Sequence, residues 1–228
     1  MEPFRTHHDV DAQLRAEGWT PCGKGDWAYA LASPDGTRAA RISPFDPVGP
    51  FTARLYREAA ASGRVPHLVT HERLRGGADL QIMELLLPVP AREAAAFLAA
   101  LPREHPALLA VVDRVHALAR AALPWCGPLD TNPSNVMRRA DGILVLADPY
   151  YADGPDLYAT AERDPDLLVA RIPEQERRHM TEIPLAESGP WPEEQRMALR
   201  ERIRQADARA ARHRRTASRK HDHEEDGS

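Results

Sequence analysis

The sequence predicts an α+β fold in which a small antiparallel sheet comes first and a truncated, mainly helical part follows. Within the first ninety residues, short alternating segments are separated by turns that contain Gly and Pro, as is typical of antiparallel strands. Further along, Leu108, Val112, Val115 and Ala119 recur at helical spacing. Hydrophobic residues make up 43% and charged residues 28% of the 228 residues, an ordinary mixture for a folded protein.

Composition and charge argue against several classes of protein. The longest apolar runs are far too short to span a bilayer, so we expect no membrane partner. The first residues have no apolar stretch behind a basic segment, so we expect no secretory signal. The use of only two cysteines suggests a reducing cytoplasm. The net charge of -4 gives no reason to expect a nucleic-acid partner. The two cysteines, Cys22 and Cys126, form no C-x-x-C pair, which argues against a cysteine zinc site or a disulfide scaffold.

The elements of the first part can be justified in chain order. Val10 and Leu14 are four positions apart and can share one face of a short helix. A Ser-Pro-Asp-Gly turn at 33–36 predicts a β-hairpin, and Gly63 ends a helix. The expected elements are a helix within 1–20, strands at 27–31 and 37–42, a helix at 51–62, and strands at 67–74 and 79–87.

The second part is predicted to be helical with one short hairpin. Pro192 suits the first turn of a last helix, and an Asp141-Gly142 turn precedes a short apolar strand. The expected elements are helices at 91–101, 106–123 and 192–212, a loop at 124–137 and a strand at 143–146. No regular structure is expected over 152–189, because this segment has no clear period and contains Pro155, Pro165, Pro173 and Pro184. We divide the chain into a first lobe at 1–87, a reduced helical lobe at 88–210 and a disordered charged tail at 211–228.

Three oxygen-bearing side chains carry the chemistry. Asp130 and Asn135 lie five positions apart in a Pro-containing loop, and Asp148 follows a short strand thirteen positions later. A hairpin of that length brings its two ends together, so Asn135 and Asp148 can face one point. An amide oxygen and a carboxylate make a hard-oxygen site suited to Mg²⁺. Asp130 can then reach a hydroxyl nucleophile near the metal, as phosphoryl transfer requires.

At these residues the chain resembles the protein-kinase-like superfamily, which includes protein kinases and aminoglycoside-phosphotransferase-like kinases. The catalytic-loop pattern D-x-x-x-x-N reads DTNPSN here, and Asp148-Pro149-Tyr150 stands where the family has D-F-G. The resemblance implies a two-lobed fold, with Asp130 and Asn132 in catalytic positions and Asn135 and Asp148 as metal ligands. Asn132 occupies the position of the family's catalytic-loop lysine.

The first ninety residues resemble the nucleotide-binding lobe of the same superfamily. Gly23-Lys24-Gly25 resembles the start of the glycine-rich loop, and Arg41 stands where V-A-I-K has its lysine. Glu58 resembles the αC glutamate that pairs with that lysine, and Glu84-Leu85 resemble the hinge that binds adenine. The resemblance covers about residues 18–150 and implies ATP and Mg²⁺ as cofactors. It also implies a protein or small-molecule hydroxyl as acceptor.

Several departures set this chain apart from that pattern. His-Arg-Asp is replaced by Pro128-Leu129-Asp130, which removes the arginine that senses activation-loop phosphorylation. Only 80 residues follow Asp148, too few for a full helical lobe, so a compact kinase like those of bacteriophages and actinobacteria is expected. Lys24 and Lys220 are the only lysines, so an arginine in place of lysine can reflect a GC-rich genome.

Arg41 leaves three interpretations open. Arg41 can hold the phosphates in a reshaped pocket, Lys24 can reach them instead, or the site can bind nucleotide poorly and transfer nothing. Simpler interpretations also stand beside the functional ones. Asp130 and Asn135 can be turn formers, the glycines an ordinary turn, and Glu58 a solvated residue paired with Arg54.

The function predicted from the sequence is an ATP- and Mg²⁺-dependent kinase acting on a hydroxyl, with protein Ser/Thr favoured by the proline in the catalytic loop. The alternatives are a pseudokinase that binds nucleotide without transfer, and an unrelated α+β adaptor that docks through its basic C-terminal helix. His7-His8 and His221-Asp222-His223 have metal-binding side chains, but we expect mobile termini and no metal site there.

Overall fold

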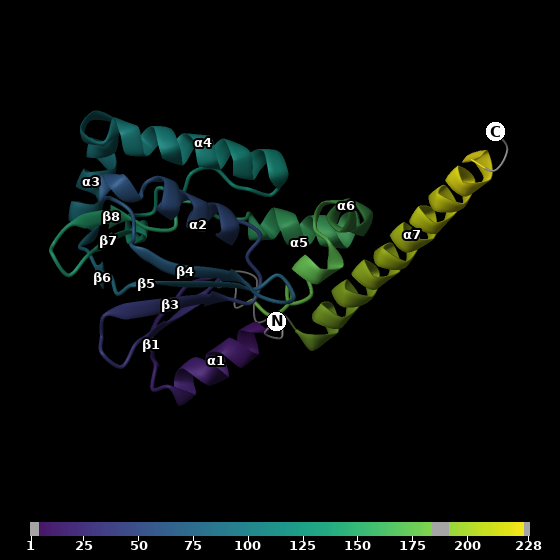
Figure 1. Cartoon of the computed structure of the whole chain (residues 1–228), viewed down its shortest axis with the longest axis horizontal. Helices are drawn as coiled ribbons and strands as arrows, with labels where there is room; N and C mark the ends of the chain where they lie inside the picture. Colours follow the sequence, from purple (N-terminus) through teal and green to yellow (C-terminus); the bar gives the residue numbers. More distant parts are fainter. Residues whose placement is uncertain (1–4, 184–191, 226–228) are drawn as a thin grey trace.

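The structure is a computed structural model that describes residues 5–183 and 192–225. It confirms the α+β prediction, with a five-stranded antiparallel sheet of order β1-β2-β3-β5-β4 and a three-stranded sheet of order β6-β7-β8 (Figure 1). The strands are β1 Thr20–Lys24, β2 Tyr29–Ala32, β3 Arg38–Ser43, β4 Leu68–Arg73, β5 Asp79–Glu84, β6 Leu87–Pro88, β7 Val136–Arg138 and β8 Leu144–Leu146. The helices are α1 His7–Ala16, α2 Gly49–Glu58, α3 Ala91–Glu104, α4 Pro106–Ala122, α5 Gly154–Arg163, α6 Pro165–Arg171 and α7 Glu193–Glu225, with short 3₁₀ turns at Ala60–Ser62, Pro133–Asn135 and Glu174–Glu176.

Helices cover both faces of the larger sheet. On one face, Val10 and Leu14 of α1 pack with Ala40 and Ile42 of β3 in a small apolar cluster. On the other face lie α2, α3 and α4 (Figure 1). Because side chains alternate along a strand, Arg41 points away from α1. The alternation of side chains along β3 therefore places the Arg41 guanidinium on the face of the sheet opposite α1.

The largest apolar core joins the sheet side of the molecule to the helices beyond it. Leu55 and Tyr56 of α2 share this core with residues of α3, α4 and β8. Its fully buried members include Leu55, Val115, Ala94 and Ala119. We expected a boundary between two lobes at residues 87 and 88. One apolar core contains side chains from both sides of that position, so this boundary stays a prediction.

The strand β1 was not expected from the sequence. We predicted four strands in the first ninety residues, and the structure adds the two-residue strand β6 and the strand β1, which pairs antiparallel with β2. All five of its residues are exposed, so β1 lacks the inward and outward alternation that identifies a strand. Pro21 is accommodated because β1 is an edge strand.

The prediction of no regular structure over 152–189 was wrong for its described part. The side chains of Asp153 and Asp164 accept hydrogen bonds from backbone N–H groups and cap α5 and α6. Pro155 and Pro165 stand in the first turns of these helices, where proline is favoured. The prolines that suggested irregular chain therefore mark helix starts. Residues 184–189 lie outside the described residues.

The last helix is longer than expected. It begins at Glu193 as predicted and runs to Glu225, through most of the segment that we expected to be a disordered tail. Leu199, Ile203 and Ala206 recur on one buried face, and α7 contacts α5 and α6 through its first half. Beyond them α7 projects away from the body (Figure 1). Arginine, alanine and glutamate dominate its sequence and are strong helix formers.

No single helix of the described residues has both the length and the apolar composition of a membrane span; α3 and α4, bent by 97° at their junction, pass that test only as a pair.

Candidate functional site

A cavity of about 1050 Å³ lies between the larger sheet and the segment that runs from residue 128 to 152. Ten of the eleven predicted site residues line it, and Glu58 is the exception. The ten are Gly23, Lys24, Gly25, Arg41, Glu84, Leu85, Asp130, Asn132, Asn135 and Asp148. These residues come from five separate parts of the chain.

Backbone hydrogen bonds hold the catalytic-loop segment against Asp148. The Ala147 N–H donates to the Asn135 carbonyl at 2.7 Å, and the Asp130 N–H donates to the Pro149 carbonyl at 2.9 Å. Asp148 thus lies between two residues that are bonded to the two ends of the loop. The β7–β8 hairpin continues this pairing, as expected from its length. Asp130, Asn135 and Asp148 consequently meet at one end of the cavity.

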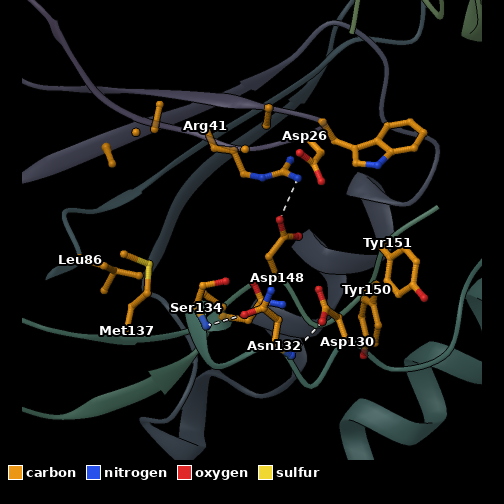
Figure 2. A pocket seen from close by; sticks show the side chains of 18 of the residues that line it. Asp26, Arg41, Leu86, Asp130, Asn132, Ser134, Met137, Asp148, Tyr150 and Tyr151 are labelled. Carbon is orange, nitrogen blue, oxygen red and sulfur yellow. Dashed lines mark hydrogen bonds and ion pairs between the residues drawn. The ribbon is translucent and has the colours of Figure 1, made fainter. Parts of the chain in front are cut away.

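The loop itself is built from two consecutive side-chain turns. Asp130 Oδ1 accepts a hydrogen bond from the Asn132 N–H at 2.8 Å, and Asn132 Oδ1 accepts one from the Ser134 N–H at 3.0 Å (Figure 2). Asp and Asn favour such turns. The turn-forming interpretation of Asp130 is therefore correct for one of its oxygens, and the residue still lines the cavity.

Asp148 has an unusual backbone and an incompletely satisfied side chain. Its φ of 48° is the only positive value among the described non-glycine residues. The Asp148 N–H donates to the Tyr56 hydroxyl at 3.0 Å, and this bond holds the residue from the α2 side. Its Oδ1 is buried and has no hydrogen-bond partner. Burial raises the pKa of Asp148; Arg41 opposes the shift and Asp46 adds to it.

Arg41 connects two carboxylates across the cavity wall. Its Nη1 donates to Asp46 Oδ2 at 2.8 Å and its Nη2 to Asp148 Oδ2 at 3.0 Å. Burial alone would lower the pKa of Arg41, but the carboxylates of Asp148 and Asp46 raise it. The forked guanidinium suits this double contact better than a lysine would. Arg41 is therefore held in place before any ligand arrives.

Asp46, like Tyr56, lines the cavity and was not expected from the sequence. Its side chain is 2% exposed, and its Oδ1 accepts hydrogen bonds from the Val48 and Gly49 N–H groups at the start of α2. An aspartate just ahead of a helix is a recognisable start signal. That signal indicates a cap and does not indicate the second contact with Arg41, which is fixed only by tertiary structure.

The predicted pairing of Glu58 with Arg41 was wrong. Glu58 binds Arg54 and Arg114, each at 2.6 Å, on the outer surface. It is the last residue of α2, and Tyr56, two positions earlier, lies about 200° away around the helix. Tyr56 therefore faces Asp148, and Glu58 faces α4. The alternative interpretation of Glu58, as a surface partner of Arg54, is confirmed.

The glycine segment forms the turn between β1 and β2 at the cavity. The Gly25 N–H donates to the Ala28 carbonyl at 2.7 Å and closes the turn. Neither Gly23 nor Gly25 has a positive φ, and a Cβ at either would make only ordinary contacts of 3.8 and 3.7 Å. The fold therefore does not need glycine at either position. Glycine would matter there to a group that lies close against the backbone.

The two ends of the cavity differ in polarity. Leu86 and Met137 lie side by side at the end far from Asp130 (Figure 2), and both belong to an apolar cluster. The charged lining side chains are five acids and two bases. They are Asp26, Asp46, Glu84, Asp130 and Asp148, with Lys24 and Arg41. This excess of negative charge would repel a free polyphosphate and favours a ligand that arrives with a cation.

Two orphaned atoms test whether a metal would fit the charged end. Besides Asp148 Oδ1, the Asn135 side-chain nitrogen is buried without a hydrogen-bond partner. A half-turn of the amide about χ2 exchanges its nitrogen and oxygen, so Asn135 can present an oxygen at the same place. A carboxylate and an amide oxygen, both free, fit the ligand preference of Mg²⁺.

Comparison with known proteins gives structural neighbours only. No protein-family model matches the chain, and no curated protein matches it. Among solved structures, a chain of the CAK complex from Chaetomium thermophilum bound to ATP-gamma-S aligns over 63% of this chain and 51% of its own length. The identity is 16% and the TM-score is 0.34. This chain spans about half of the length of that neighbour.

Two further neighbours are bacterial. The PknI kinase domain of Mycobacterium tuberculosis is 16% identical, with 72% of this chain and 86% of that chain aligned and a TM-score of 0.31. The macrolide 2'-phosphotransferase MphH from Brachybacterium faecium is 15% identical, with 80% and 84% aligned and a TM-score of 0.36.

Proposed function

We propose that this chain is an ATP- and Mg²⁺-dependent phosphotransferase that passes the γ-phosphate to a hydroxyl group, with protein serine or threonine as the first candidate acceptor. The observation that carries the proposal is the meeting of Asp130, Asn135 and Asp148 at the charged end of a cavity whose other end is apolar. A nucleotide has the same polarity, with a flat base at one end and phosphates at the other. The proline within the catalytic loop favours a protein acceptor.

The apolar end would hold the base. The Leu85 N–H already donates to the Thr37 carbonyl, and the Glu84 side chain is bound by the His67 N–H and by Arg139. These groups are therefore engaged within the protein. A base at this end would be held chiefly by apolar contact with Leu86 and Met137.

The charged end would hold the phosphates. Asn135 and Asp148 would bind Mg²⁺, which neutralises negative charge on the transferred phosphate when it is bound. Arg41 would give up its contact with Asp148 and pair with a phosphate oxygen, while Asp46 keeps its position. The backbone of Gly23–Gly25 would lie over the phosphates, close enough that a side chain there would interfere.

Asp130 would orient the acceptor. Its Oδ1 is fixed by the Asn132 N–H, which directs the other oxygen to the incoming hydroxyl. In the transfer, the acceptor oxygen bonds to the γ-phosphorus and the bond from that phosphorus to the ADP oxygen breaks. The hydroxyl proton passes to Asp130. Asn132 contributes the turn that positions this carboxylate, rather than the charge of the lysine it replaces.

Production of ADP from ATP tests the proposal, with wild type compared against Asp148→Asn. Asparagine tolerates the left-handed backbone at this position, so the variant should fold. We expect Mg²⁺-dependent turnover in wild type, stimulated by a hydroxyl acceptor, and its loss in the variant. A panel of protein acceptors and of small hydroxylated compounds identifies the acceptor class. Equal turnover in both proteins would remove the assignment.

A nucleotide-binding module without transfer activity is the second candidate, and one observation favours it. Arg41 is engaged by Asp46 and Asp148 together, so one oxygen of the proposed metal ligand is already occupied. Thermal melting with ATP, with and without Mg²⁺, separates the two candidates. Stabilisation by ATP with no turnover in any acceptor panel would favour the binding module.

A further inference from the structure

Two histidines at the start of α1 meet a glutamate near the end of the described range 5–183. His7 Nε2 lies 3.4 Å and His8 Nε2 3.3 Å from Glu182 Oε2. One ligand atom from each of the three residues lies within 4.8 Å of the others. The sequence analysis expected no metal site at these histidines, because it placed them in a mobile terminus; the structure places them in a helix against Glu182.

The distances within this cluster suit a shared cation better than direct hydrogen bonds. A charge-assisted N–H···O⁻ bond is about 2.7–2.9 Å long, shorter than either contact. In a tetrahedral zinc site with ligands about 2.05 Å from the metal, neighbouring ligand atoms lie about 3.4 Å apart. The two nitrogen–oxygen distances therefore match the edges of such a site.

A fourth residue orients the glutamate. His179 Nδ1 lies 2.9 Å from Glu182 Oε1, the oxygen that faces away from His7 and His8. His179 is itself seated on Gly76, where an added Cβ would lie 2.1 Å from its ring. Its backbone N–H also donates to the Gly76 carbonyl. A carboxylate held through its second oxygen in this way is typical of metal sites.

His7 supplies a second, independent observation. Its side chain is only 4% exposed, so burial holds Nε2 beside Glu182; the nitrogen without a hydrogen-bond partner is Nδ1, on the other side of the ring. The His7 ring packs against the rings of His8 and His179, with centroid distances of 3.9 and 4.7 Å, and this packing fixes its orientation.

We propose that His7, His8 and Glu182 bind a divalent cation of the Zn²⁺ class, and that this cation ties α1 to the segment that precedes α7. Two imidazoles and one carboxylate are a ligand set that zinc accepts, with a fourth position left for water. The site is separate from the cavity, because none of the three residues lines it. The proposal therefore does not depend on phosphotransfer.

The cation would also stabilise the segment 176–182, which contacts Arg41 indirectly through Arg73 and Asp46. Glu176, six positions before Glu182, pairs with Arg73 at 2.7 Å. Arg73 in turn donates to the Asp46 carbonyl at 2.6 Å. We therefore expect the metal to act on stability through the segment 176–182, rather than to take part in chemistry.

Cobalt titration of the full chain, first freed of metal with a chelator, tests the proposal. Co²⁺ in a tetrahedral site gives a visible absorption band. This band disappears when Zn²⁺ displaces the Co²⁺. We expect one equivalent to bind in wild type, and Zn²⁺ to raise the melting temperature. In His8→Ala and in Glu182→Gln the affinity should fall at least about tenfold, as it does when the surroundings of a metal are disturbed. His8 is 71% exposed, so His8→Ala should retain the fold.

The other histidine pair of the chain provides the matched control. The double variant His221→Ala/His223→Ala should bind Co²⁺ as wild type does. The proposal is overturned if wild type shows no stoichiometric band, or if His8→Ala and Glu182→Gln bind with wild-type affinity. Loss of the band in the His221/His223 variant would assign the metal to that pair and would equally overturn it.

Discussion

The guanidinium of Arg41 lies 3.0 Å from Asp148 Oδ2, although 107 positions separate the two residues in the chain. One oxygen of Asp148 is thus held by a cation, and the other is buried and free. The contact joins the strand that would carry phosphate-binding charge to the residue that would carry the metal. It also means that a ligand must rearrange an existing ion pair when it binds.

Removing the Arg41 side chain should destabilise the protein strongly. In Arg41→Ala, the buried Asp46 loses its cation and keeps only its backbone contacts. Breaking a buried ion pair in this way costs about 3–5 kcal/mol. Urea unfolding measures the change in the free energy of unfolding. Arg54→Ala, which breaks an exposed pair, is the control; a loss no larger than that of the control would contradict the prediction.

Asp148→Asn should stabilise the metal-free protein at neutral pH. Because the pKa of Asp148 is raised on folding, its contribution to stability is full below the unfolded-state pKa and is lost as pH rises through the folded-state value. At pH 7 the ionised carboxylate is therefore a net cost, which asparagine removes. The midpoint of urea unfolding should be higher for the variant than for wild type at pH 7. The difference between the two midpoints should become smaller as the pH falls. A lower midpoint at pH 7 would refute this.

Tyr56→Phe should weaken binding of the nucleotide–metal complex as well as stability. The variant leaves the Asp148 N–H without its acceptor, at a cost of about 1–3 kcal/mol. Tyr158→Phe is the matched control, because it removes another buried hydroxyl, which donates to the Met180 carbonyl and lies outside the cavity lining. Calorimetric titration with ATP and Mg²⁺ should show weaker binding in Tyr56→Phe only. Equal weakening in both variants would mean that the Tyr56 bond has no particular role at the site.

Glu58→Gln should leave turnover unchanged, whereas Asp46→Asn should reduce it. Glu58 contacts Arg54 and Arg114 at the surface, and Asp46 holds Arg41. We expect Asp46→Asn to raise the KM for ATP and to lower kcat, because Arg41 loses its anchor. Steady-state kinetics of the two variants in parallel makes the comparison. A large loss in Glu58→Gln would restore the original sequence-based assignment.

Lys24→Ala should raise the KM for ATP with little effect on stability. Lys24 is exposed on β1 and lines the cavity. A single charge at about 4 Å from a phosphate in water contributes about 1 kcal/mol, which corresponds to about a fivefold change in KM. If KM rises far more in Lys24→Ala than in Arg41→Lys, then Lys24 is the principal phosphate contact. An unchanged KM would remove Lys24 from the site.

The predicted residues that the structure brings to one cavity are those with short-range signals. A loop and a hairpin fix the relation of Asp130, Asn135 and Asp148 within nineteen positions. Arg41 was assigned by its resemblance to the lysine of V-A-I-K, and the roles of all four residues stay predictions. Asp46 and Tyr56 were missed because their contacts depend on the orientation of α2 about its own axis. Packing of α2 against β3 and α4 sets that orientation, and no short-range sequence signal reveals it. Glu58 was misassigned for the same reason, since its phase around the helix decides its partner.

The fold shows the same division. Strands and helices with one buried face were predicted from periodicity, as with β3 and α4. The exposed strand β1 gave no such signal, because its pairing with β2 depends on backbone bonds alone. In α5 and α6, the capping aspartates were present, but the prolines that follow them were interpreted as loop residues.

The core that Leu55 and Tyr56 share with α3, α4 and β8 constrains how a guest molecule reaches the cavity. If the larger sheet and the helices α3 and α4 moved apart to open the cavity, these side chains would lose their packing and become exposed to water. The β1–β2 hairpin has no such attachment along β1, whose residues are all exposed. Movement of β1 therefore exposes the least apolar surface, whereas the rest of the hairpin is held by the buried Leu31 of β2 and by Trp27, which packs against the largest core. The rate at which a ligand enters and leaves the cavity should accordingly depend on this one edge strand.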